Sequence, residues 1–208
     1  MRIERSRRWF VSALATAGAA GVCGTARACG FDGAFDASFG SIHPRAIEIA
    51  LAVRRAVADG LLPQDALDPL TPGAVGLWHA TEALKRLGQC LSAATEARLQ
   101  SFDIALLCSD ASLWTRYAGN AQGFETLVHV DKPAATDVVA ITELAIVAAL
   151  VEGRLPVQSA VARGLLVVEA SGDSTDAFVA LLSAGCGKSS GGSVGLTSRT
   201  PWGISRLR

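Results

Sequence analysis

The chain has 208 residues, half of them hydrophobic, and its 19 Lys and Arg side chains equal its 19 Asp and Glu side chains in number. This balance argues against nucleic-acid binding, since proteins that bind nucleic acid carry basic patches. A chain of this length and apolar content can bury one good core, or one domain with a helical extension.

The first 28 residues have the pattern of a cleavable export signal. A basic start is followed by an Ala- and Gly-rich apolar stretch over residues 11–22, which is too short to span a bilayer. Small residues at Ala26 and Ala28 favour cleavage after Ala28. The basic start contains Ser6-Arg7-Arg8-Trp9-Phe10-Val11, which resembles the twin-arginine consensus through the pair Arg7 and Arg8. The sequence therefore predicts a periplasmic protein.

An ordinary secretory signal that happens to contain two arginines is the alternative. The weak hydrophobicity of residues 11–22 and the charge of Arg27 beside the cleavage site favour the twin-arginine route. The mature chain would have 180 residues and a net charge of about −4. We expect no membrane span in it, because its most apolar run, residues 138–151, is short and contains Glu143.

Four cysteines remain after the predicted cleavage: Cys29, Cys90, Cys108 and Cys186. An even number in an oxidising compartment indicates two disulfides, for which three connectivities are possible. One disulfide with buried free thiols is the alternative. No two of these cysteines have the CxxC spacing of a thioredoxin-like site.

The first half of the mature chain is predicted to be helical. Residues 29–40 form an irregular arm, and Pro44 opens a helix that Gly60 ends. Residues 61–76 contain three prolines and predict a loop. A second helix is expected over residues 77–94, with an apolar face made by Trp78, Leu84, Leu87 and Leu91.

The second half predicts strands at residues 98–108, 113–118, 126–130 and 137–141, joined as a meander by short connections. Thr142 can cap a helix that Gly153 ends, a short helix follows over residues 157–163, and a strand at 165–170 leads into a helix capped by Asp173. This order predicts an α+β fold: a mostly antiparallel sheet of about five strands, backed by helices on one face. The tail from residue 185 is rich in Gly and Ser, and we expect it to be disordered.

Three segments carry a resemblance to a known family: Ile141-Thr142-Glu143-Leu144, residues 151–156 and residues 162–167. Together with the element order over about residues 97–184, they resemble the sterol carrier protein type two fold. The resemblance implies an apolar tunnel for lipid-like ligands, or a domain used to build complexes, and brings no catalytic residues. The final Gly of the family's strand is displaced here to Gly172. The arm, the Trp114 strand and the last helices also resemble exported proteobacterial proteins.

The resemblance and the composition divide the chain into a signal (1–28), an arm with two helices (29–95), a sterol-carrier-like domain (96–184) and a tail (185–208). No motif predicts an enzyme or a cofactor. Gly185-Cys186-Gly187-Lys188-Ser189 lacks the first Gly of a phosphate-binding loop, and the Gly-x-Ser-x-Gly letters at 191–195 lie in the tail. Asp103 and Asp110 are interpreted as turn or edge residues.

Trp114 and Arg116 are the most distinctive candidates for binding. Strand alternation places them on one sheet face, where they could stack on a ligand, or where Trp114 could fill the core and Arg116 extend from it. We expect an apolar groove between the sheet and the helices at 142–152 and 173–184, lined by Leu144, Val147 and Val151.

The sequence therefore predicts an exported, non-enzymatic binding or accessory protein. Its ligand would be an apolar small molecule or a periplasmic protein. One alternative is a maturation or assembly factor for a periplasmic oxidoreductase. Another is a metal-handling protein that uses an N-terminal arm containing Cys29, Asp32, Asp36 and His43.

Overall fold

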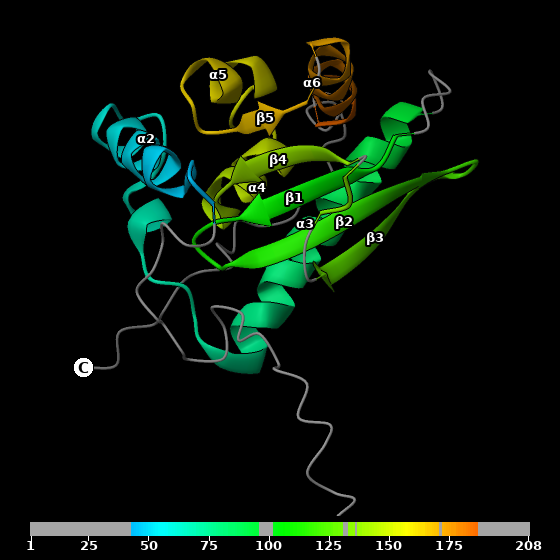
Figure 1. The fold of residues 1–208 in the computed structure, drawn as a ribbon. Helices are drawn as coiled ribbons and strands as arrows, with labels where there is room; N and C mark the ends of the chain where they lie inside the picture. The colour runs from blue at the N-terminus through cyan, green and yellow to red at the C-terminus, as the bar shows by residue number, and fades with distance from the viewer. Residues whose placement is uncertain (1–42, 96–101, 131–132, 136, 171, 187–208) are drawn as a thin grey trace, which may run out of the picture.

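A five-stranded mixed sheet with the strand order β3-β2-β1-β4-β5 forms the centre of the protein (Figure 1). The structure, a computed structural model, describes residues 43–95, 102–130, 133–135, 137–170 and 172–186. The predicted export signal with Arg7 and Arg8, the arm with Cys29, and the tail from residue 187 lie outside the described residues.

The strands are β1 (Ile104–Cys108), β2 (Leu113–Asn120), β3 (Gly123–Val130), β4 (Val138–Thr142) and β5 (Val167–Glu169). β1, β2 and β3 pair as antiparallel neighbours, and β5 pairs antiparallel with β4. The predicted α+β class, with a mostly antiparallel sheet, is confirmed. The predicted meander is wrong in one connection, because β4 leaves β3 and pairs in parallel with β1. β1 is apolar and buried along its whole length, which suits a strand enclosed on both sides.

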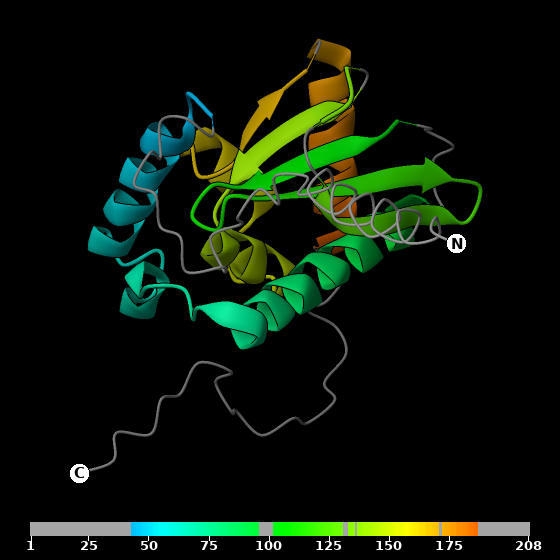
Figure 2. The ribbon, with the colours of Figure 1, turned by 60° about the horizontal axis from the view of Figure 1, so that its bottom comes forward.

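The helices are α2 (Ala46–Ala58), α3 (Gly73–Thr95), α4 (Leu144–Val151), α5 (Val157–Ala162) and α6 (Gly172–Cys186), with a 3₁₀ turn, η1, at Gln64–Leu67. Figure 2 shows α3, α4 and α6 on one face of the sheet. Tyr117 of β2 connects the sheet to the helices on this face, since its buried hydroxyl donates a hydrogen bond to the Leu84 carbonyl of α3 at 3.1 Å. No helix of the described residues has both the length and the apolar character needed to cross a membrane.

α3 packs closely beneath β2 and β3, although it belongs to the segment before residue 95. A Cβ atom on Gly88 would lie 2.1 Å from the Thr126 Oγ1 atom of β3. A side chain at this position would therefore require the Thr126 hydroxyl to move, and glycine lets the helix lie close to the strand. One core cluster joins side chains of α2, α3 and the sheet, so the two helices of the first half share the core of the α+β part.

Three helix boundaries or faces differ from the prediction. α3 begins at Gly73 rather than at Leu77, and η1 lies within the predicted loop. Trp78 was expected on the buried face of α3 but is 60% exposed. The buried stripe instead runs through Ala80, Leu84, Leu87 and Leu91, and Trp78 lies about 150° around the helix from its centre. α6 continues through Gly185 and Cys186, which the prediction assigned to the tail.

Candidate functional site

The carboxyl ends of β1 and β4 bring two acidic side chains together. Asp110 follows β1 and Glu143 follows β4, and these two strands are parallel neighbours whose ends meet at one edge of the sheet. Ligands of open α/β sheets commonly bind outside such ends. This edge of the sheet is therefore a candidate ligand-binding site.

Asp110 is fixed by the start of α4. Both of its carboxylate oxygens lie 3.2 Å from the backbone nitrogen of Leu144, and Oδ1 also accepts the N–H of Ala111 at 3.0 Å. The first N–H groups of a helix have no partner within the helix, and an acidic side chain there also interacts favourably with the helix dipole. Asp110 thus caps a helix that lies 34 residues further along the chain.

The cap predicted at Thr142 is wrong. The Thr142 hydroxyl donates its hydrogen bond to the Leu165 carbonyl at 2.7 Å and so connects β4 to the segment before β5. Glu143 occupies the N-cap position, but its side chain makes no cap hydrogen bond. Because Asp110 supplies the cap, the Glu143 carboxylate is left for another role.

A pocket of about 210 Å³ opens over these two carboxylates. Ala50 and Arg54 of α2 form one wall, and η1 with the residues after it forms another. The lining combines apolar and charged side chains: Ala50, Arg54, Ala66, Leu67, Asp68, Pro69, Leu70, Asp110 and Glu143. The pocket has room for a small organic group with a polar end.

Burial shifts both carboxyl groups toward neutrality. Desolvation raises the pKa of Asp110 to about 6, against the opposing effect of the N–H groups that it accepts. Desolvation, followed by the nearby charge of Asp110, raises the pKa of Glu143 to about 7, although Arg54 opposes the shift. Both groups therefore change protonation between about pH 6 and pH 7.

Glu143 is the unusual member of the pair. The residue is only 9% exposed. Among the described residues, no group donates a hydrogen bond to its carboxylate, which has only the more distant charge of Arg54 opposite it. Buried carboxylates without a partner are costly, and perturbed groups in clefts gather at functional sites. The arrangement can bind a cation or a strong hydrogen-bond donor.

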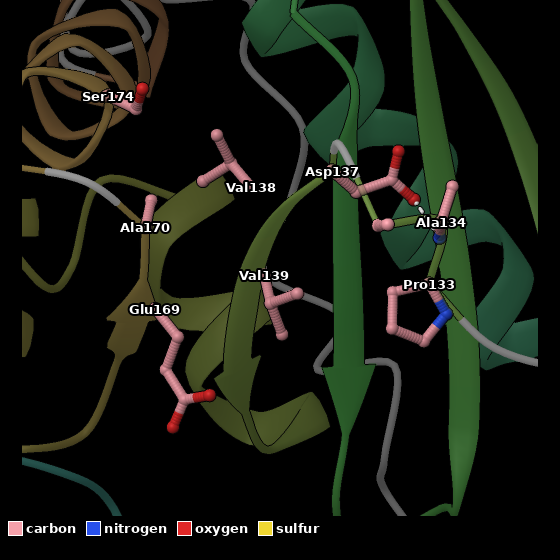
Figure 3. A pocket seen from close by; sticks show the side chains of 9 residues that line it. Pro133, Ala134, Asp137, Val138, Val139, Glu169, Ala170 and Ser174 are labelled. Atoms are coloured by element: carbon pink, nitrogen blue, oxygen red, sulfur yellow. Dashed lines mark hydrogen bonds between the residues drawn. The ribbon is translucent and has the colours of Figure 1, made fainter.

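A second pocket, of about 530 Å³, lies between residues 133–135 and 137–139 on one side and the strand end at Glu169 and Ala170 on the other (Figure 3). Its acidic groups already have partners. The Asp137 carboxylate accepts the Ala134 N–H at 2.7 Å, and Glu169 lies 3.5 Å from His43 and 3.7 Å from Arg45. It therefore offers less to a ligand than the pocket at Glu143.

Arg116 holds two carboxylates on the sheet face opposite α3. One of its terminal nitrogens lies 2.7 Å from Asp103 Oδ2 and 3.1 Å from Asp137 Oδ1. The side chain of Asp137 is fully buried, whereas those of Arg116 and Asp103 are each 32% exposed. Asp103 also accepts the Gly119 N–H at 2.9 Å. Asp103, taken as an edge or turn residue from the sequence, is thus one end of an ion-pair network.

The binding residues predicted from the sequence lie on two sides of the sheet. The burial pattern confirms that Thr115 and Tyr117 share the core face while Trp114 and Arg116 share the other. Leu144 and Val147 belong to α4, which packs on α3 at the core face, and both are buried in the core. Val151 is partly buried against the same core. The structure therefore does not bring Trp114 or Arg116 together with the α4 residues, and neither pocket described above is lined by any of the five.

The remaining candidates are the described cysteines and His43. Cys90, Cys108 and Cys186 are free thiols, and Cys90 and Cys186 lie in contact. His43 accepts the Arg45 N–H through Nδ1 and faces Glu169 through Nε2. The described residues contain no group of three or more His, Cys, Asp or Glu side chains placed to hold a metal ion.

No family model, curated protein or solved structure matches this chain. The resemblance to the sterol carrier protein type two fold therefore stays a prediction from the sequence. The candidate site rests on the geometry of its own residues.

Sequence reasoning missed the Asp110–Glu143 pair. From the sequence, Asp110 is interpreted as a turn or edge residue, and Glu143 is given no role in a site. The available signal was that an acidic residue follows each of two apolar strands: Asp110 comes after the first and Glu143 after the second. It becomes informative only once the two strands are known to be parallel neighbours.

Proposed function

We propose that this chain is an exported binding protein without chemistry of its own, and that the pocket at Asp110 and Glu143 takes a small organic cation with an apolar body. The observation that carries the proposal is Glu143, a residue only 9% exposed, whose carboxylate lines a pocket and has no hydrogen-bond donor among the described residues. Export is supported by the twin-arginine pattern at Arg7 and Arg8.

The charge of the pocket favours a cation. Asp68, Asp110 and Glu143 are acidic, and Arg54 is the one basic residue in the lining. An ammonium group donates three hydrogen bonds. Its positive charge would stabilise the ionised form of the two carboxylates, which desolvation disfavours. Ala66, Leu67 and Leu70 provide an apolar wall for the rest of the molecule.

Benzylammonium is a suitable probe, with neutral benzyl alcohol as its matched control. Calorimetry of the purified protein at pH 8 should show that benzylammonium binds and benzyl alcohol does not. Binding should weaken at least about tenfold at pH 5.5, because Glu143 with a pKa of about 7 is then protonated. Repeating the titration in buffers of different ionisation enthalpy at pH 6.5 should reveal proton release.

Glu143→Gln is the decisive variant, and Glu152→Gln at the other end of α4 is its control. Glu152 is exposed and paired with Arg154, so its replacement should leave binding unchanged. Glu143→Gln keeps the size of the side chain and should lose most of the pH dependence of the affinity, so that only the part carried by Asp110 near pH 6 remains. Equal binding of the alcohol and the amine, or unchanged binding by Glu143→Gln, would contradict the proposal.

An accessory role toward a protein partner is the second candidate, favoured by exposed apolar side chains. Ile47 and Leu51, one turn apart on α2, are 54% and 48% exposed, and Trp78 at the start of α3 is 60% exposed. Trp is enriched in binding hot spots. Replacing Ile47 and Leu51 together by Glu should abolish co-purification of a partner while leaving benzylammonium binding intact. A partner retained by this double variant would exclude α2 as its binding surface.

A further inference from the structure

Two cysteines from distant parts of the chain meet where α6 crosses α3. Cys90 lies in α3 and Cys186 is the last residue of α6, and their free thiols lie in contact. In Figure 2 the C-terminal end of α6 reaches α3 on the helix-covered face of the sheet. The contact is independent of the carboxylate pocket.

Gly185 makes this contact possible. A Cβ atom at this position would lie 2.0 Å from the Cys90 carbonyl oxygen and 2.6 Å from the carbonyl carbon. Real Cβ atoms do not approach so closely, so a side chain here would push the two helices apart. The small residue places the backbone of α6 directly on that of α3 at Cys90. The next residue, Cys186, thereby reaches the Cys90 thiol.

We propose that Cys90 and Cys186 form a reversible disulfide that ties α6 to α3, made by exchange with a small-molecule or protein disulfide. The exposure of the two residues indicates which thiol reacts first with the oxidant. Cys90 is partly exposed and can meet an oxidant, whereas Cys186 is only 3% exposed and can react only with its neighbour. Cys108 is fully buried and takes no part.

The reactivity of the thiols supports the same order of reaction. The neighbouring Cys186 thiol lowers the pKa of Cys90, which favours the thiolate form of the more exposed partner. Burial raises the pKa of the Cys108 thiol well above its ordinary value, and the charges of Asp110 and Glu143 add to this. Thiolates, not thiols, attack disulfides.

With glutathione disulfide as the oxidant, the reaction has two exchange steps. The Cys90 thiolate attacks one glutathione sulfur, so that a Cys90–glutathione bond forms, the glutathione S–S bond breaks and one glutathione thiolate leaves. The Cys186 thiol then loses its proton to solvent, attacks the Cys90 sulfur and displaces the second glutathione thiolate. Two protein thiols are oxidised to one disulfide, and one glutathione disulfide is reduced to two thiols.

Peptide mapping tests the pairing directly. The purified full chain is treated with glutathione disulfide at pH 7.5, alkylated and digested with trypsin. We expect peptide 87–98, which contains Cys90, to be joined to peptide 164–188, which contains Cys186, while Cys108 in peptide 99–116 is recovered alkylated. The Cys108→Ser control should give the same link. Cys90 and Cys186 recovered as separate alkylated peptides, or Cys90 joined to Cys23, Cys29 or Cys108, would overturn the proposal.

Two single variants test the order of the steps. Cys186→Ser should stop the reaction at a Cys90–glutathione adduct, which mass spectrometry detects as added glutathione. Cys90→Ser should take up no glutathione at Cys186. An adduct on Cys186 in the second variant would reverse the assigned roles and contradict the exposure argument.

The thermal transition gives a second measurement. The bond closes a loop of roughly 96 residues, for which loop entropy predicts a rise in Tm on the order of 10 °C on oxidation. The wild type and Cys108→Ser should show this rise, and dithiothreitol should reverse it. Cys90→Ser and Cys186→Ser should show none. A mapped disulfide without any rise would exclude its role as a tie between the helices.

Discussion

Asp110 and Leu144 join the two parallel central strands to the helix behind them. The carboxylate that follows β1 accepts the first free N–H of α4, which follows β4, at 3.2 Å. Because the cap comes from another strand, the position of α4 depends on the β1–β4 pairing. The same bond leaves Glu143 free to line the pocket.

Removal of this cap should destabilise the protein by a measurable amount. We expect Asp110→Ala to lower the free energy of unfolding by about 1–2 kcal/mol, the usual cost of losing a helix cap. Asp110→Asn keeps an oxygen that can accept the Leu144 N–H and removes the buried charge whose desolvation raises the Asp110 pKa to about 6, so it should cost less than Asp110→Ala or be neutral. Urea unfolding at pH 7 measures both variants. An equal loss in the two would mean that the charge of Asp110, and not its acceptor oxygen, stabilises α4.

The raised pKa of Glu143 makes stability fall as pH rises. The group has a pKa of about 7 in the folded protein and an ordinary value of 4.5 when unfolded. Between these values the folded state binds more protons than the unfolded state, so the free energy of unfolding decreases from about pH 4.5 to pH 7. Glu143→Gln cannot ionise and should be more stable than the wild type at pH 8 by about 1–3 kcal/mol.

Urea unfolding of Glu143→Gln from pH 4.5 to pH 8 measures this effect. The gain over the wild type should be absent at pH 4.5 and complete by pH 8. The control Glu152→Gln should follow the wild type throughout, since Glu152 is exposed at the C-terminal end of α4. A pH-independent difference would show that Glu143 is not titrating in this range.

Arg116 should matter more for stability than an exposed arginine. Its removal would leave the fully buried Asp137 carboxylate without the charge that lies 3.1 Å away. We expect Arg116→Met to cost about 2–4 kcal/mol, less than a wholly buried pair because Arg116 is partly exposed. Arg163→Met, whose partner Asp59 is exposed, should cost under about 1 kcal/mol. Similar costs for the two variants in chemical denaturation would contradict the role given to Asp137.

Gly185 and Gly172 offer a matched pair within α6. Gly185→Ala would place a Cβ atom 2.0 Å from the Cys90 carbonyl oxygen and should cost about 1–3 kcal/mol through overpacking. Gly172→Ala meets nothing within 4 Å and should be neutral or stabilising by under about 1 kcal/mol. Thermal unfolding of the reduced proteins compares them. A well-tolerated Gly185→Ala would show that α6 and α3 are free to separate at Cys90.

The amino-acid sequence by itself determined the elements whose signals are local. Gly60 and Gly153 end their helices as predicted, and both have positive φ angles, because glycine adopts this conformation at little cost. Alternation in β2 predicted which side chains share a face, since successive residues of a strand point to opposite sides. These signals act within a few residues, and for that reason the α+β class could be predicted.

Only the tertiary structure decided which of these elements meet. The parallel pairing of β4 with β1 brought Asp110 and Glu143 to one edge, although 33 residues separate them in the sequence. The crossing of α6 over α3 brought Cys90 and Cys186 into contact, although 96 positions separate them in the sequence. Periodicity and capping residues do not specify such contacts, because strand order and helix crossings depend on how the whole chain buries its apolar surface.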